Sequence, residues 1–140
     1  MKMLMVAAVS LVVLSADPPT LSTSRELKQL QGEWVLEGGE KNGTKLELEP
    51  GDPKMVLEIR GDKWIFMGQE KGRIIAIDSR NLDTKSSEEG RVGEIDEGIY
   101  KLNGDTLTIC FYQGKGKNRP TDFASKDDDT ILAVFKRSKK

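Results

Sequence analysis

Three observations predict an all-β fold for this chain: a small antiparallel barrel of about eight strands, preceded by a short helical turn. Apolar residues alternate with polar ones with a period of two, as in Leu107, Ile109 and Phe111. Asn-Gly pairs at 42–43 and 103–104 are strong signals of hairpin turns. The length of 140 residues fits one domain with one modest core.

The first residues have the order of features that is typical of a signal peptide. Lys2 supplies a positive charge, 4–14 is an uncharged apolar run, and the small residues Ser15 and Ala16 follow. We therefore interpret 1–16 as a signal peptide, with cleavage after Ser15 or after Ala16. The apolar run is shorter than the ~20 residues that span a bilayer. The sequence thus predicts an exported protein, periplasmic or extracellular, with no transmembrane segment in the mature chain.

A polar linker at 17–24 leads into the predicted barrel domain, residues 25–138. Thr23 stands three residues before Glu26, which is the spacing of a capping box at the start of a helix. We therefore expect one or two helical turns at 25–30, directly before the first strand.

Turn signals divide the remaining sequence into short runs. Gly-Asp at 61–62 and the segment GQEKG at 68–72 separate runs in addition to the two Asn-Gly pairs. The polar segment 81–91 is too hydrophilic for a core strand and predicts a long mobile loop. Consecutive short strands with tight turns favour a closed antiparallel barrel or a sandwich. The expected strands are 33–38, 44–48, 54–60, 62–67, 72–79, 93–102, 105–112 and 130–137.

Gly32 and Trp34 form a Gly-x-Trp pair at the start of the first expected strand. Glycine permits a tight turn or the close approach of another backbone, and we expect the tryptophan to fill one end of the barrel. Arg137 lies on the last expected strand, on the same face as Phe135. If the barrel closes, these two strands are neighbours. Arg137 then lies over the Trp34 ring and donates to nearby carbonyls.

This pairing of a Gly-x-Trp on the first strand with a basic residue on the last resembles the signature of lipocalins and other calycins. A closer resemblance covers most of the chain. The chain is similar to an uncharacterised lipocalin-like domain family of planctomycete bacteria. Five blocks of its sequence lie in the same order as in that family: LQGEW at 30–34, AID at 76–78, GIYKLNGDTLTICF at 98–111, RPTDFASK at 119–126 and ILAVFKR at 131–137. The resemblance implies a small secreted lipocalin-like β-barrel with no established activity and no catalytic residues. At 126–130, KDDDT replaces the glycine-rich turn expected for the family.

The sequence contains no histidine. This excludes Ser-His-Asp and Cys-His catalysis and removes the commonest metal ligand. The single cysteine, Cys110, excludes an internal disulfide, and its position in a strand indicates a small buried residue. No other set of side chains supplies a nucleophile, a base and an oxyanion donor. We therefore expect no enzyme activity, no cofactor and no metal site.

Charged residues are balanced, with 22 Lys and Arg against 23 Asp and Glu and a net charge of -1. No overall positive field is available to attract nucleic acid. Lys115, Lys117 and Arg119 form a candidate patch for an anionic surface, and a solvated basic loop is the alternative. We interpret the acidic cluster at 94–97 as solvation of an exposed strand edge.

Two functions agree with these features. The first is a binding module that holds a small apolar ligand inside the barrel, with its open end opposite Trp34. The residues expected to line that cavity are Met55, Leu57, Trp64, Phe66, Ile109 and Phe111. The second is a filled barrel that acts through its surface as a protein-interaction or cell-envelope module, with an envelope protein as partner. In either case we expect a monomer.

Overall fold

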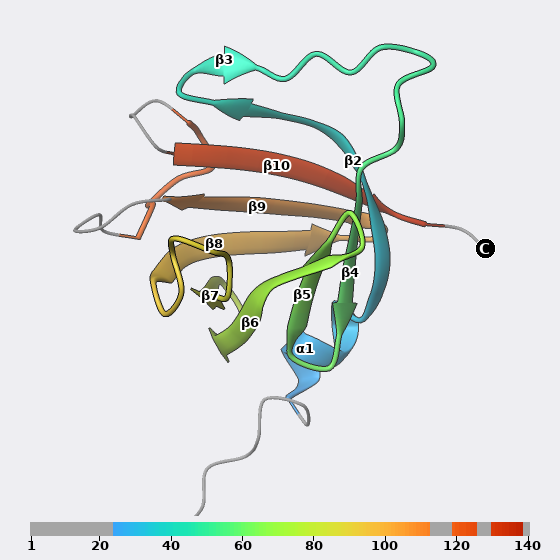
Figure 1. Ribbon diagram of the computed structural model, residues 1–140. Coiled ribbons are helices and arrows are strands. Elements are labelled where there is room, and N and C mark those ends of the chain that lie inside the picture. The colour runs from blue at the N-terminus through green and yellow to red at the C-terminus, as the bar shows by residue number, and fades with distance from the viewer. Residues whose placement is uncertain (1–23, 113–118, 126–129, 139–140) are drawn as a thin grey trace, which may run out of the picture.

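A computed structural model describes residues 24–112, 119–125 and 130–138, so the predicted signal peptide lies outside the described residues. Within this part of the chain one short helix, α1 (Arg25–Gln29), precedes nine strands (Figure 1). The strands are β2 (Gly32–Lys41), β3 (Thr44–Lys45), β4 (Val56–Arg60), β5 (Lys63–Phe66), β6 (Gln69–Ile77), β7 (Asn81–Ser86), β8 (Ile95–Asn103), β9 (Thr106–Tyr112) and β10 (Thr130–Arg137).

The strands form one closed antiparallel barrel. From β4 to β10 each strand pairs with the next one along the chain, β4 also pairs with β2, and β10 pairs back with β2 (Figure 1). The barrel therefore contains eight strands, β2 and β4 to β10, while β3 is bonded only to β2 and stays outside the ring. This arrangement confirms the predicted all-β, lipocalin-like barrel with a short helical turn before it.

Two of the predicted elements exchange roles in the structure. The segment 81–91, predicted as a loop, begins with β7, which pairs with both β6 and β8 and completes the wall between them. Leu82 and Ser86 on this strand are only 3% and 7% exposed. The segment 44–48, predicted as a strand, contributes only the two residues of β3. The barrel therefore has the predicted eight strands, but β7 is one of them and the predicted strand 44–48 is not.

The two Asn-Gly pairs form different turns. Asn42 and Gly43 have φ angles of 54° and 80°, and a type I′ turn requires both to be positive. The second turn is shifted by one residue, because Asn103 is still part of β8. Its central residues are Gly104, with a φ of 58°, and Asp105. Glycine at the first central position is the pattern of a type II′ turn.

The turn expected at 68–72 lies earlier in the structure. Met67 and Gly68, with φ angles of 54° and 80°, form the turn between β5 and β6, and Gln69 already belongs to β6. A methionine with positive φ is uncommon, so the sequence favoured the glycine-flanked segment instead. One consequence is that Lys71 lies on a barrel strand and not in a loop.

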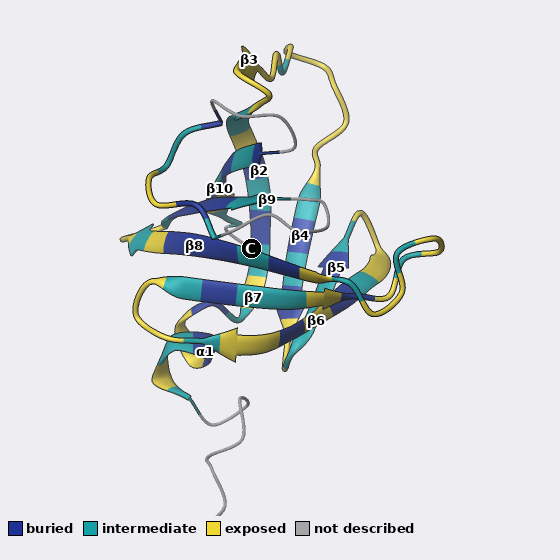
Figure 2. Ribbon diagram, turned by 90° about the vertical axis from the view of Figure 1, so that its left-hand side faces the viewer, coloured by how far each residue is buried: buried dark blue, intermediate teal, exposed yellow. Residues whose placement is uncertain are grey.

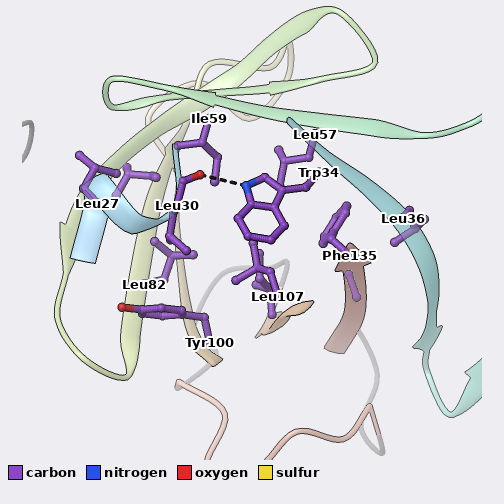
Figure 3. Close-up of a cluster of buried hydrophobic side chains, with 13 residues drawn as sticks. Leu27, Leu30, Trp34, Leu36, Leu57, Ile59, Leu82, Tyr100, Leu107 and Phe135 are labelled. Carbon is purple, nitrogen blue, oxygen red and sulfur yellow. Dashed lines mark hydrogen bonds between the residues drawn. The ribbon is translucent and has the colours of Figure 1, made fainter. Parts of the chain in front are cut away.

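The hydrophobic core fills the end of the barrel at which β2 begins. Trp34 is fully buried there, and α1 covers the same end with Leu27 and Leu30, which are also buried (Figure 3). The Trp34 Nε1 donates to the Leu30 carbonyl at 2.9 Å, so the ring is tied to the chain after the helix. Ser24 caps α1, because its Oγ accepts from the Leu27 amide at 3.0 Å. The predicted cap, Thr23, lies outside the described residues.

The opposite end of the barrel is less completely walled by strands. Regular pairing between β2 and β4 covers only 32–35 and 56–59. Beyond it the later half of β2 pairs with β10 and β3. Figure 2 shows β3 and the connection from it to β4 as mostly exposed, whereas each of the eight barrel strands carries buried residues. At this end of the barrel, the gap between β2 and β4 is therefore bordered by the connection from β3 to β4 and not by paired strands.

Candidate functional site: a cavity at the open end of the barrel

A contact between the first and last strands holds the closed end of the barrel. The guanidinium carbon of Arg137 lies 4.2 Å from the centre of the Trp34 ring. Its nitrogens donate to the carbonyls of Gln31 at 3.0 Å and Gln29 at 2.8 Å, and Asp105 lies 3.7 Å away. Arg137 thus satisfies carbonyls that the end of α1 leaves without helical partners.

Gly32 belongs to the same end of the barrel and is needed for its backbone conformation. Its φ is 116°, a value that residues with side chains rarely adopt. A Cβ added there would lie 3.5 Å from Nη1 of Arg137, which is an ordinary contact. The glycine therefore permits a sharp entry from α1 into β2. Gly32, Trp34 and Arg137 line neither of the two cavities at the other end of the barrel.

The half of the barrel away from Trp34 contains a cavity of about 310 Å³. Of the six residues predicted to line a ligand cavity, five lie on its wall. Further apolar side chains come mainly from β2 and β10. The five predicted residues are Met55, Trp64, Phe66, Ile109 and Phe111, and the added apolar residues are Leu36, Leu46, Ile131, Ala133 and Phe135.

The sixth predicted residue, Leu57, lies outside the cavity wall. Its register on β4 is opposite Trp34, so it packs into the closed end and is fully buried. Two lining residues on the connection between β3 and β4 reach solvent, since Leu46 is 42% exposed and Met55 is 37% exposed. The mouth of the cavity therefore lies at this connection, at the end opposite Trp34.

A second, smaller cavity of about 60 Å³ adjoins the first. The two share Trp64, Lys71, Glu88, Ile109 and Phe111 as wall residues. The rest of the smaller cavity's wall comes from β6, β7, β8 and the connection between β7 and β8, and four of its six residues are polar or charged. Its additional lining residues are Gly72, Leu82, Thr84, Ser86, Arg91 and Asp96.

Arg91 organises the charges of this polar wall. One of its terminal nitrogens donates to Asp96 Oδ1 at 2.6 Å, and the guanidinium also lies 3.4 Å from Glu94 and 3.9 Å from Glu88. Burial raises the pKa of the Asp96 carboxyl, because desolvation outweighs the nearby Arg91 charge. The Lys71 ammonium donates to a neutral acceptor, the Gln69 side-chain oxygen, at 3.2 Å.

Sequence reasoning missed this polar half of the site. The cluster at 94–97, interpreted as solvation of an exposed edge, instead contains Asp96, which is only 8% exposed and lines the smaller cavity. The missing signal was alternation on β7, where Leu82, Thr84 and Ser86 all line the smaller cavity. Only the first of these three is apolar, so the run did not have the pattern of a strand.

The predicted basic patch is not assembled by the described residues. Lys115 and Lys117 lie outside them. Arg119 forms two hydrogen bonds to the Asp83 carboxylate, at 2.5 and 3.1 Å, and a third to the Gly98 carbonyl at 2.8 Å. The hydrogen bond with Asp83 raises the pKa of Arg119. Its charge is therefore matched by a carboxylate, and the segment 119–125 is fastened to the outer side of β7 and β8.

Two buried side chains that could take part in chemistry, Cys110 and Tyr100, are not activated for it. Cys110 is fully buried and its Sγ donates to the Ala124 carbonyl at 3.4 Å. Burial raises the pKa of its thiol, which disfavours the nucleophilic thiolate. Tyr100 donates to the Asp78 carbonyl at 2.6 Å, and burial raises the pKa of its hydroxyl to about 12. Among the described residues, no group of three His, Cys, Asp or Glu is placed to hold a metal ion.

Comparisons of the chain with protein-family models, with curated proteins and with solved structures found no match. The likeness to the planctomycete lipocalin-like family thus rests on the sequence blocks alone. In the part of the chain that the structure describes, no helix has the length and apolar character needed to cross a membrane.

Proposed function

We propose that this protein is an exported, non-enzymatic, lipocalin-like binding module that holds a small apolar ligand inside its barrel. The observation that carries the proposal is the cavity of about 310 Å³ at the open end. Its volume is at the lower end of the ~300–1,000 Å³ range of small-molecule sites. Aromatic and aliphatic side chains with a few charged ones form its wall, which is the usual composition of such sites.

The position of the cavity also suits ligand entry. Leu46 and Met55 line it and are partly exposed at its mouth. Trp64, Phe66 and Phe111 are each only partly buried, although they are large apolar residues. A ligand in the cavity would remove this apolar surface from water, which contributes roughly 25 cal/mol for each Å² buried.

Other parts of the proposal rest on the sequence. Export is supported by the charge, apolar run and small residues of 1–16, in that order. A non-enzymatic role is supported by the lack of histidine in the chain. The five sequence blocks support the same assignment, because the family they resemble is a secreted barrel domain.

A fluorescent fatty-alcohol analogue, titrated into the purified protein, tests ligand binding. We expect saturable binding and quenching of tryptophan emission. The quenching should persist in Trp34→Phe and disappear in Trp64→Phe, since only Trp64 lies on the cavity wall. Met55→Trp should abolish the probe's own fluorescence change by filling the mouth. Met67→Trp is the matched control, because Met67 is also exposed but lines neither cavity.

The filled-barrel function is the alternative, and the packing of the closed half favours it. The side chains of Trp34, Leu57 and Leu107 are fully buried there. If no apolar probe binds while circular dichroism shows a folded protein, the ligand-binding proposal fails. The protein then acts through its surface, as an interaction or cell-envelope module.

A further inference from the structure

We infer that the ligand is amphipathic, with an apolar body in the larger cavity and a small, uncharged head group bearing hydroxyls in the smaller one. This inference rests on the proposed ligand-binding function and specifies the chemistry of the ligand. It follows from the arrangement, the charge and the size of the two cavities.

The arrangement places two unlike surfaces side by side. Both cavities have charged residues in their walls, but only the smaller one is also lined by Thr84 and Ser86 and by the ion pair between Arg91 and Asp96. The two cavities share wall residues, so one molecule can reach both. A plain hydrocarbon would displace water from these charged and hydroxyl-bearing side chains and offer them no hydrogen bond in exchange, which costs free energy.

The charges of the smaller cavity argue against a charged head group. Lys71 and Arg91 line it together with Glu88 and Asp96, so acidic and basic groups are equal in number. Arg91 already contacts three carboxylates. An anion would lie against two acidic groups and a cation against two basic ones, and either would lose hydration on entry. A hydroxyl can donate to a carboxylate and accept from Lys71 at the same time.

The size of the smaller cavity limits the head group. Its volume of about 60 Å³ is a small fraction of the volume of about 310 Å³ of the larger cavity. It is also well below the ~300–1,000 Å³ of sites that hold whole small molecules. A head group of one or two hydroxyls therefore suits it better than a sugar ring or a phosphate diester.

The experiment compares ligands that share one decyl chain. The decyl alcohol, decane-1,2-diol, decanoate, decylamine and decane are each used to displace the fluorescent probe from the purified protein. We expect the diol or the alcohol to bind about tenfold more tightly than the two ions and than decane, a difference of about 1.4 kcal/mol. Decanoate or decylamine binding as tightly as the alcohol would overturn the inference, and so would equal binding of decane.

The outcomes separate this inference from the proposed function. If the probe binds and none of the decyl ligands displaces it, the head-group assignment is wrong and ligand binding stands. If neither the probe nor any decyl ligand binds the folded protein, the proposed function itself fails.

Variants locate the head group. Ser86→Ala and Asp96→Asn should each weaken binding of the diol several-fold and leave the affinity for decane unchanged. Ser87→Ala is the matched control, because this neighbouring serine is exposed and lines neither cavity. Equal losses for the diol and for decane would show that these side chains only support the wall, and would refute the assignment.

Discussion

The contact between Trp34 and Arg137 leads to the prediction that substitutions of these two residues are not additive. Trp34→Ala removes a fully buried ring and its hydrogen bond to Leu30, which we expect to cost ~3–5 kcal/mol of unfolding free energy. Arg137→Ala removes the ring contact and two hydrogen bonds to carbonyls. The Arg137 side chain is 33% exposed, so we take the lower part of each range and expect ~2 kcal/mol.

The double variant should lose less than the sum of the two single losses. Once the Trp34 ring is absent, Arg137 no longer has a π face above which to lie, and its remaining value is that of the carbonyl contacts alone. We expect a coupling energy of ~1 kcal/mol. Urea unfolding followed by far-ultraviolet circular dichroism measures it for all four proteins, without relying on tryptophan emission.

Lys136→Ala provides the control, because this neighbouring residue on β10 is exposed. Its effect should stay within ~0.5 kcal/mol. Additive losses for Trp34 and Arg137, within ~0.5 kcal/mol, would refute the reasoning. The guanidinium would then act only on the α1 carbonyls, and the ring contact would add nothing to closure of the barrel.

Three further predictions concern export, pH and thiol chemistry. The intact mass of the protein recovered outside the cytoplasm should correspond to a chain that begins at Ala16 or Asp17; full-length protein in the cytosol would contradict this. The folded-state pKa of Asp96 is raised, so this carboxyl should stabilise the fold less as pH rises above about 4. In urea unfolding between about pH 4 and 7, its share of the free energy of unfolding should fall with pH, and Asp96→Asn should remove that fall. An unchanged pH dependence in the variant would count against this prediction. Cys110 should react with a thiol reagent only after denaturation, and rapid labelling of the folded protein would disprove its burial.

The fold could be predicted where burial and local turn chemistry agree. On β9, apolar residues alternate and the predicted bounds, 105–112, differ from the observed Thr106–Tyr112 by one residue. On β7 the two signals disagree. Its inward residues at the open end are polar, since they face the polar cavity, and the strand lacks an apolar stripe. A strand whose inner face serves a polar site is therefore hidden from a pattern that assumes an apolar interior.

The candidate site follows the same division. Trp64, Phe66 and Ile109 could be placed on the cavity wall because alternation alone assigns them to the inner face. Asp96 could not be placed in this way. Its burial depends on Arg91, which comes from the connection between β7 and β8, and the sequence does not show where a connection folds back. Partners brought together by tertiary structure are what local patterns cannot supply.

The contrast between the closed end around Trp34 and the open mouth also predicts where substitutions are tolerated. At the closed end, α1, β2 and β10 meet around Trp34, so a change there disturbs packing and the connection between both ends of the chain at once. At the mouth, Leu46 and Met55 have few such constraints, because the connection that carries them is largely exposed. Exchanges to Ala at these two positions should therefore cost at most ~0.5 kcal/mol of stability while altering ligand affinity. A larger cost in urea unfolding would mean that the connection is part of the core, and that the mouth is closed in the folded protein.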